Sequence, residues 1–169
     1  GCAAFPPHEG SRSARLESVS HRVQTMLVQE LMKTHVVKTT PGATLGEAAD
    51  LMDIYQVSAL PVVDESGTLC GMITERDIAG ALEPVGLDSA RAGDWDSALA
   101  TLSAAGAKVV GKFMTKPAVS VCENADAREA AIMMLNTGLK RAPVTRSDGV
   151  VIGTLNRIDI LEALFESAL

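Results

Sequence analysis

An internal repeat constrains the fold of this chain more than any other feature of its sequence. Residues 32–82 align with residues 114–164 without a gap, and 15 of the 51 aligned pairs are identical. The offset is 82 positions throughout, and it keeps the residues that shape a backbone in register: Pro61 with Pro143, Gly67 with Gly149, Gly71 with Gly153 and Asp77 with Asp159. A copy of about 50 residues buries too little apolar surface to be stable alone. We therefore expect the two copies to pack together, sheet against sheet.

Both copies predict a strand followed by a helix. The strands are short runs rich in β-branched residues, Val36–Thr39 and Val119–Val121. After the first run, Thr44 and Glu47 form an S/T-x-x-E capping box, which marks a helix start because each side chain satisfies a free backbone amide. In the second copy, Asn124 or Asp126 can take the capping position.

A hairpin and a second helix complete each copy. In the first copy, strands at residues 60–63 and 68–73 flank a turn at residues 64–67. The second copy turns at residues 147–149, where glycine supplies a positive φ. The last helices are expected to begin near Glu75 and Arg157. This order, present twice, predicts an α+β fold of two tandem βαββα repeats related by pseudo-two-fold symmetry.

The repeat also divides the chain into four parts. We expect an N-terminal extension at residues 1–30, with a helix over residues 15–30. The first repeat is expected at residues 31–82 and the second at residues 109–169. Between them, residues 83–108 are expected to form a linker with a short helix over residues 94–103, capped by Asp94.

Charge and hydropathy exclude two classes of partner. The net charge is −6, and no basic run is longer than Lys140-Arg141, so we expect no nucleic-acid partner. The longest weakly polar stretch, residues 97–107, is too short to span a bilayer, so we expect no membrane partner. The chain begins with Gly1 instead of methionine, which indicates a processed or engineered start.

The cysteines and histidines do not form a recognisable catalytic or metal site. Cys2, Cys70 and Cys122 are odd in number and have no C-x-x-C spacing, which predicts buried free thiols and a cytoplasmic location. The histidines are scattered and lack metal-ligand spacing: His8, His21 and His35. We expect no metal and no enzymatic activity. A thiol-dependent enzyme using Cys70 or Cys122 stays an alternative that needs an exposed thiol and a nearby base.

Two segments of the first copy resemble a known family. Residues 57–64 (VSALPVVD) and 71–77 (GMITERD) are similar to the cystathionine-β-synthase (CBS) domain, and the pair of copies resembles a Bateman module. The likeness covers about residues 31–82 and 111–169. The second segment fits the family's adenosyl-nucleotide pattern, G-h-x-[ST]-x-x-[DN]. The resemblance implies a regulatory module that senses AMP, ADP, ATP or S-adenosylmethionine between the repeats, with no obligatory cofactor.

The chemistry of these residues suits such a ligand. A helix that starts directly after a strand presents free amides and the positive end of its dipole to a phosphate. Thr74 adds a hydroxyl there, and Asp77 can accept from both ribose hydroxyls. In the second copy, Asn156 replaces the hydroxyl and Asp159 is kept. The alternative is that Thr74 and Asp77 only cap their helix. We call the two places the Asp77 crevice and the Asp159 crevice.

The resemblance implies composite sites, each completed by the other repeat. The Asp77 crevice would add residues 119–122, including Val121 and Cys122, and the Asp159 crevice would add Thr39, Thr40 and Ala43. Near the cleft, the two prolines follow matching residues, which are Ser58 in the first copy and the pair Lys140 and Arg141 in the second. The two cations could bind phosphate, or they could only lie at the solvent-exposed edge of a hairpin. We expect the ligand to bind first at the Asp77 crevice, because the first copy matches the nucleotide pattern more fully.

Apolar helix faces predict a homodimer. Leu51, Met52, Met133 and Met134 are not all expected to turn inward, and large exposed apolar patches usually mark interfaces. A structural dimerisation unit without a ligand, or a regulatory fragment of a larger enzyme or transporter, are the alternative functions. The sequence names neither the ligand nor the downstream effector.

Overall fold

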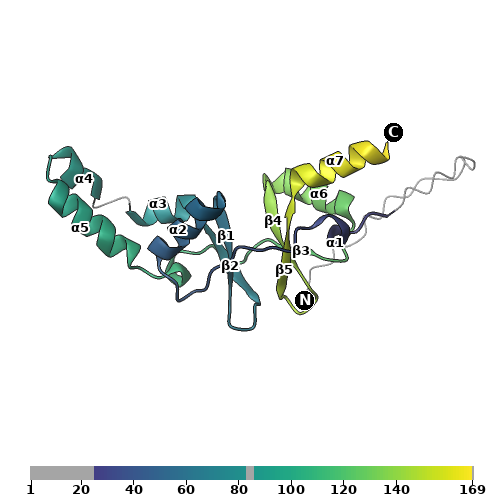
Figure 1. Ribbon diagram of the computed structural model, residues 1–169, viewed down its shortest axis with the longest axis horizontal. Coiled ribbons are helices and arrows are strands. Elements are labelled where there is room, and N and C mark those ends of the chain that lie inside the picture. The colour runs from purple at the N-terminus through teal and green to yellow at the C-terminus, as the bar shows by residue number, and fades with distance from the viewer. Residues whose placement is uncertain (1–24, 83–85, 169) are drawn as a thin grey trace, which may run out of the picture.

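The protein consists of two lobes, each built on a small sheet that is covered by helices (Figure 1). A computed structural model describes residues 25–82 and 86–168. The first lobe contains α2 (Leu45–Tyr55), β1 (Ala59–Val63), β2 (Leu69–Thr74) and α3 (Glu75–Leu82). The second lobe contains α1 (Val28–Leu31), β3 (Val121–Cys122), α6 (Ala127–Thr137), β4 (Arg141–Thr145), β5 (Val151–Asn156) and α7 (Arg157–Ser167). The connection carries α4 (Gly86–Arg91), α5 (Trp95–Gly106) and the short 3-10 helix η1 (Val110–Lys112).

The two repeats have the same secondary structure, as the sequence predicts. Pro61 in β1 faces Met72 in β2, and Pro143 in β4 faces Thr154 in β5, both in antiparallel pairs. Each hairpin also shows a register shift at the same place, one residue after Val62 and one residue after Val144. The α+β fold of two tandem βαββα repeats is therefore confirmed.

The tips of the two hairpins lie next to each other between the lobes, at the lower edge of the view in Figure 1. The Leu69 N–H donates to the Gly149 carbonyl and the Val151 N–H donates to the Gly67 carbonyl, both at 3.0 Å. The 82-residue offset aligns Leu69 with Val151 and Gly67 with Gly149, so each of these hydrogen bonds is the symmetry equivalent of the other. The pseudo-two-fold axis therefore passes between the tips. Gly67 and Gly149 have φ values of 81° and 86°, a region that side-chain-bearing residues rarely adopt.

Each lobe is completed by a segment from the start of the other repeat. The Lys33 N–H and carbonyl pair with Thr154 of β5, both at 2.8 Å. In the first lobe, Thr115 pairs with Met72 of β2 at 2.8 and 3.1 Å. Val28 is accordingly buried in the core of the second lobe and Val110 in the core of the first. The chain therefore crosses between the lobes twice.

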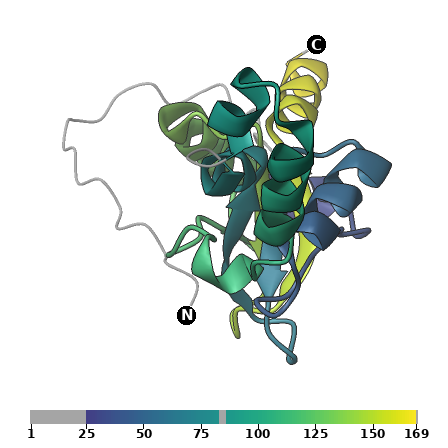
Figure 2. The same ribbon diagram turned by 90° about the vertical axis from the view of Figure 1, so that its left-hand side faces the viewer.

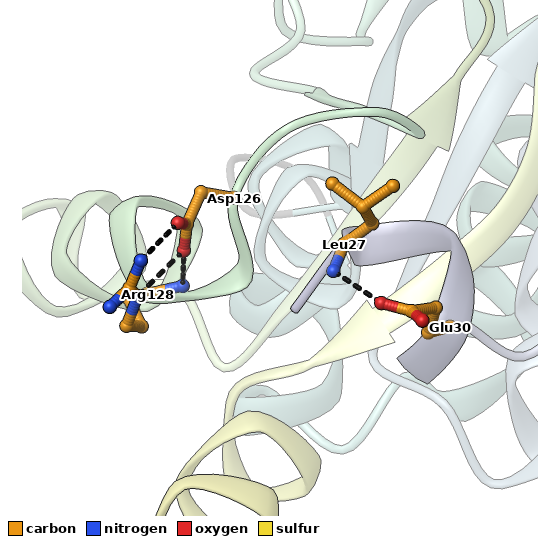
Figure 3. Close-up of polar contacts among 4 residues, drawn as sticks. All are labelled: Leu27, Glu30, Asp126 and Arg128. Carbon is orange, nitrogen blue, oxygen red and sulfur yellow. Dashed lines mark hydrogen bonds and ion pairs between the residues drawn. The ribbon is translucent and has the colours of Figure 1, made fainter. Parts of the chain in front are cut away.

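Side chains predicted to cap helices do so. Thr44 accepts from the Glu47 N–H at 3.1 Å, and Glu47 accepts from the Thr44 N–H at 2.8 Å, which forms the predicted capping box of α2. Asp126, and not Asn124, is the cap of α6, where it accepts from the Arg128 N–H at 2.8 Å. Its carboxylate also binds the Arg128 guanidinium at 2.6 Å, beside the Leu27–Glu30 contact that begins α1 (Figure 3).

Three predicted elements differ from the structure. Two of the differences arise because the chain passes from one lobe to the other. Residues 36–39 form no strand, because only Thr39 pairs with Val62 of β1. Residues 25–27 are not helical, because the Met26 carbonyl and Val28 N–H bond to residues Ala127 and Ala125 of the second repeat. Residues 15–24 of that predicted helix lie outside the described residues. The strand expected at residues 119–121 is found as β3, which begins at Val121.

The connection is more helical than its glycines and prolines indicate. Helix α5 starts at the predicted cap, where Asp94 accepts from the Ser97 N–H at 3.1 Å, and it continues to Gly106. Its buried alanines are Ala98 and Ala105, and Figure 2, seen from the end of the molecule that carries α4 and α5, shows α5 lying across the first lobe. No helix among the described residues is long and apolar enough to cross a membrane.

The apolar residues from which a dimer was predicted are core residues, so that interface is wrong in detail. Met52 and Met134 are buried, and Leu51 and Met133 pack against the same cores. The helix faces expose other large side chains: Ile54, Tyr55, Ile132, Leu135, Ile158 and Phe165. The apolar face that the helices expose to solvent is therefore a different face from the predicted one.

The segments around Lys33 and Thr115, which we call the crossing segments because each pairs with the sheet of the other lobe, approach two glycines too closely for any side chain. A Cβ at Gly71 would lie 2.8 Å from the Thr115 carbonyl oxygen, and one at Gly153 would lie 2.9 Å from the Lys33 carbonyl oxygen. We expect Gly71→Ala and Gly153→Ala each to lower the free energy of unfolding by about 1–3 kcal/mol. Gly80→Ala in α3, where nothing lies within 4 Å, is the control and should raise stability by up to about 1 kcal/mol. Urea unfolding of the three variants measures this. Equal stability of all three would contradict the close approach of the Thr115 and Lys33 backbones to Gly71 and Gly153.

The Asp126–Arg128 pair should make stability depend on pH. Its hydrogen bond with Arg128 lowers the pKa of Asp126 from the ordinary value of 3.8. A carboxyl whose pKa is lower in the folded state contributes stability above its unfolded pKa and loses it as pH falls through the folded pKa. Arg128→Ala should therefore lower the free energy of unfolding near pH 7 and leave it unchanged once Asp126 is protonated. Urea unfolding of both proteins at neutral and strongly acidic pH tests this, and a difference that persists in acid would refute it.

Candidate functional site

Thr74 and Asp77 form a closed reciprocal cap at the start of α3. The Asp77 Oδ2 atom accepts from the Thr74 N–H at 2.9 Å and from the Thr74 hydroxyl at 2.8 Å. The Thr74 hydroxyl oxygen in turn accepts from the Asp77 N–H at 3.2 Å. Both side chains are partly buried. Thr74 and Asp77 therefore do cap their helix, and Asp77 does so through Oδ2. Its Oδ1 atom receives no hydrogen bond from residues 25–82 and 86–168.

Asn156 and Asp159 form a different arrangement at the start of α7. Asn156 Nδ2 donates to Asp159 Oδ2 at 3.1 Å, and Arg141 Nε donates to Asn156 Oδ1 at 2.8 Å. Lys33 Nζ lies 3.6 Å from the same Asp159 oxygen. The Asp159 side chain is 27% exposed and the Lys33 side chain 63% exposed. A chain of polar contacts thus links the crossing segment, the helix start and the hairpin.

Ser58 and Lys140 occupy matching places beside the two helix starts. The Glu75 N–H donates to the Ser58 carbonyl, and the Arg157 N–H donates to the Lys140 carbonyl, both at 2.9 Å. Ser58 therefore belongs to the Asp77 crevice. Lys140 and Arg141, the two cations expected near a phosphate, belong to the Asp159 crevice.

The remaining predicted site residues lie beside the central strands. Thr39 and Val121 are buried, and their backbones pair with Val62 of β1 and Val144 of β4. Thr40 is exposed, and its carbonyl accepts from the Ala43 N–H at 3.2 Å. No polar side-chain contact among the described residues joins Thr39 or Thr40 to Asp159. These residues reach a ligand only if it extends across the cleft.

The two cysteines of the repeats differ from each other. Cys70 carries a free, partly buried thiol, as predicted, and its Sγ lies 3.6 Å from the Thr68 carbonyl oxygen. Cys122 is in a disulfide bond, so the prediction of a free thiol there is wrong. The sequence argument failed because an odd number of cysteines does not prevent one pair from forming.

A cleft between the lobes is lined by both repeats. Its volume is about 70 Å³, and its lining residues are His35, Val37, Val57, Ala59, Pro61, Met72, Arg141, Ala142, Pro143 and Thr154. Arg141 connects it to the contacts around Asp159. Most of the wall is aliphatic, which suits the flat face of a base. Ligand pockets usually have volumes of about 300–1,000 Å³, so a nucleotide must widen this cleft or extend out of it.

Lys33, His35 and Arg157 are site residues that the sequence reasoning missed. Lys33 lies at the start of the first repeat, so its place in the sequence indicates the wrong lobe. Only the backbone pairing with Thr154 brings it to Asp159. Arg157 could have been found, because it immediately follows Asn156 and replaces Glu75 of the first copy. Within the part of the chain that the structure describes, no three His, Cys, Asp or Glu side chains form a group that could hold a metal ion.

Sequence comparisons give relatives with the same repeat. A protein of Acidianus ambivalens, named as an uncharacterized 17.7 kDa protein, is 30% identical over 139 residues, which cover 82% of this chain and 73% of that protein. The chloroplastic CBS domain-containing protein CBSX2 of Arabidopsis thaliana is 32% identical, over 78% of this chain and 59% of its own length. An inosine-5'-monophosphate dehydrogenase of Methanocaldococcus jannaschii is 28% identical over 89% of this chain, which spans 26% of that enzyme.

Solved structures share the arrangement of the two lobes. Arabidopsis CBSX2, solved in complex with AMP, superposes with a TM-score of 0.65 at 26% identity, covering 85% of this chain and 98% of that chain. The CBS domain pair of protein MJ0100 superposes with a TM-score of 0.61 at 22% identity, covering 86% and 99%. The family model of the CBS domain matches residues 28–84 and 110–166. The chain therefore belongs to the CBS domain family and contains a tandem pair of CBS repeats.

Proposed function

We propose that this protein is a regulatory module that binds an adenine nucleotide or adenosyl compound in the cleft between its two CBS repeats. The observation that carries the proposal is the cleft itself, in which Ala59 and Pro61 of one repeat face Arg141 and Pro143 of the other. A ligand held there contacts both repeats at once. The AMP complex of CBSX2, a protein of the same fold at 26% identity, supports an adenine nucleotide as the ligand.

Each part of a nucleotide has a partner at the Asp159 crevice. The ribose hydroxyls donate to Asp159, the base lies against the aliphatic wall, and the phosphate approaches the start of α7 and the cations Lys140 and Arg141. Because those cations lie beside Asn156 and not beside Thr74, we place AMP at the Asp159 crevice, in contrast to the sequence-based preference for the Asp77 crevice. Thr39, Thr40, Val121 and Cys122 are proposed as contacts with the far side of a ligand.

Binding would regulate by shifting a conformational equilibrium. A ligand that contacts both repeats favours the angle between them at which its contacts are best, and it can shift the equilibrium only by its differential affinity. The proposed repeats at residues 31–82 and 109–169 would move relative to each other about the two segments that pass between the lobes, which follow Lys33 and Thr115. The proposed module passes this change to an effector without catalysing a reaction itself.

A second function is favoured by one comparison. The chain matches about a quarter of inosine-5'-monophosphate dehydrogenase from Methanocaldococcus jannaschii, which supports a regulatory part of a larger enzyme. The ligand site would be the same in that case, and only the effector would differ.

Calorimetric titration with AMP tests the site. We expect Asp159→Ala to weaken AMP binding about tenfold to a hundredfold, because hydrogen bonds to a charged group contribute about 1.5–3 kcal/mol. Asp77→Ala should weaken it less than about threefold. Asp94→Ala removes the helix-capping carboxylate of α5 and is the control for the capping that Asp77→Ala removes. If AMP, ADP, ATP and S-adenosylmethionine at millimolar concentration neither bind nor raise the melting temperature, the structural dimerisation unit replaces the sensor.

We further propose a homodimer formed through the exposed helix faces. Ile132 and Leu135 on α6 and Ile158 and Phe165 on α7 leave large apolar side chains in solvent, and α6 lies against α7. Exposed apolar patches of this kind usually mark interfaces.

Light scattering after size exclusion tests the dimer. We expect twice the chain mass of 17.7 kDa for the native protein at micromolar concentration, and the monomer mass for Ile132→Glu, because a buried unpaired carboxylate is costly. Leu99→Glu on α5, also at an exposed leucine, is the control. A native monomer excludes the dimer, and dissociation by Leu99→Glu alone would move the interface to α5.

A further inference from the structure

The two crevices have the same backbone but opposite charge. Four positions carry a cation at the Asp159 crevice and a neutral or acidic residue at the matching place of the Asp77 crevice: Lys33 for Thr115, Lys140 for Ser58, Arg141 for Ala59 and Arg157 for Glu75. Both crevices keep one aspartate at the same place. The formal charge of these positions together with the aspartate is therefore +3 at one crevice and −2 at the other.

The structure brings the four cations to one end of the β4–β5 hairpin. Lys33 pairs with Thr154 through its backbone and with Asp159 through its side chain, at 3.6 Å. Arg141 binds Asn156 at 2.8 Å. The Arg157 N–H donates to the Lys140 carbonyl at 2.9 Å. These contacts place all four beside the first turn of α7, where free amides add to the positive potential.

The matching end of the β1–β2 hairpin is acidic. Glu75 begins α3 and Asp77 follows in the same turn. A hollow of about 460 Å³ borders Ser58 and Glu75, and Asp53 and Glu75 are the ionisable residues that line it. Arg76 is the cation of this turn and is exposed, as Glu75 is. Its counterpart is the neutral Ile158, so counting this pair changes the formal charge of the Asp77 crevice from −2 to −1 and leaves that of the Asp159 crevice at +3.

From this asymmetry we infer that the two crevices select adenosyl ligands of different charge. The Asp159 crevice takes a ligand with a phosphate, such as AMP, and the Asp77 crevice takes one without, such as adenosine or the cationic S-adenosylmethionine. The inference rests on the proposed function and assigns a ligand class to each crevice. Phosphate beside Glu75 and Asp77 would be repelled, whereas a cationic sulfonium would be attracted.

Lys33 gives the Asp159 crevice a second means of discrimination. Its ammonium group is paired with the carboxylate that a ribose must approach. A ligand with a phosphate offers Lys33 a new anionic partner when the ribose takes its place at Asp159. A nucleoside offers Lys33 no anionic partner, so its binding gains nothing from Lys33. At the Asp77 crevice the counterpart Thr115 carries no charge, so no ion pair has to be exchanged there.

Calorimetry with AMP and adenosine on reciprocal variants tests the inference. For the native protein we expect one AMP per chain at the Asp159 crevice. Lys33→Thr, which introduces the residue of the first copy, should weaken AMP binding about tenfold and leave adenosine within about threefold or tighten it. Arg157→Glu should have the same effect on AMP. Arg91→Thr removes an exposed positive charge from α4, outside both crevices, and should change neither ligand.

The reverse exchange should create a second phosphate site. Glu75→Arg combined with Thr115→Lys gives the first crevice the charges of the second, and we expect AMP stoichiometry to rise from one to two per chain. Circular dichroism and melting temperature verify that the variants fold. Failure of the native protein to bind any adenosyl compound overturns the proposed function. Two results would overturn the inference that the crevices differ in ligand charge and would leave the proposed function intact. One is that Lys33→Thr changes the affinities for AMP and adenosine equally. The other is that the reverse exchange leaves the AMP stoichiometry at one per chain.

Discussion

The backbone pairing of Lys33 with Thr154, and of Thr115 with Met72, is the constraint on which the rest of the structure depends. Each pairing extends a hairpin with a segment from the other half of the chain and requires a glycine beneath it, Gly153 or Gly71. Because the core of each lobe also includes a residue from such a segment, Val28 or Val110, neither lobe is complete without the other half. The cleft exists because these crossings hold the two hairpins against each other.

The same crossings decide what the two aspartates can do. Among residues 25–82 and 86–168, the Asp77 carboxylate accepts only from the Thr74 hydroxyl and amide of its own repeat, so its capping role is local. Asp159 meets Lys33 from the crossing segment and Asn156 from its own repeat. One carboxylate is therefore part of a closed cap and the other of an exchangeable ion pair. A helix cap contributes about 1 kcal/mol, so capping and ligand binding can coexist when the ligand uses the second carboxylate oxygen.

Local and periodic features of the sequence predicted most of the fold. The offset of 82, the Thr44–Glu47 box, the Asp94 cap and the turn glycines are read within a few residues, and the structure confirms them. Non-local pairing was not predictable in this way. The crossing turned an expected strand at residues 36–39 into one bridge and carried Lys33 to the opposite lobe. Helical spacing also gave the wrong exposed face, because Met52 and Met134 pack inward. At the site, the sequence singled out the aspartates, Lys140 and Arg141, but only the structure shows that the two cations lie beside Asn156 and not beside Thr74.

The crossing also bears on how such a chain can arise. Two separate copies of one repeat that exchanged their leading segments would form a symmetric, segment-swapped pair with the same contacts. In such a pair both clefts would be identical, because both copies would come from one gene. Joining the copies in one chain removes that restriction, since a substitution such as glutamate to arginine at one helix start no longer appears at the other. The differences between Glu75 and Arg157 and between Thr115 and Lys33 are changes that a pair made from one gene cannot carry.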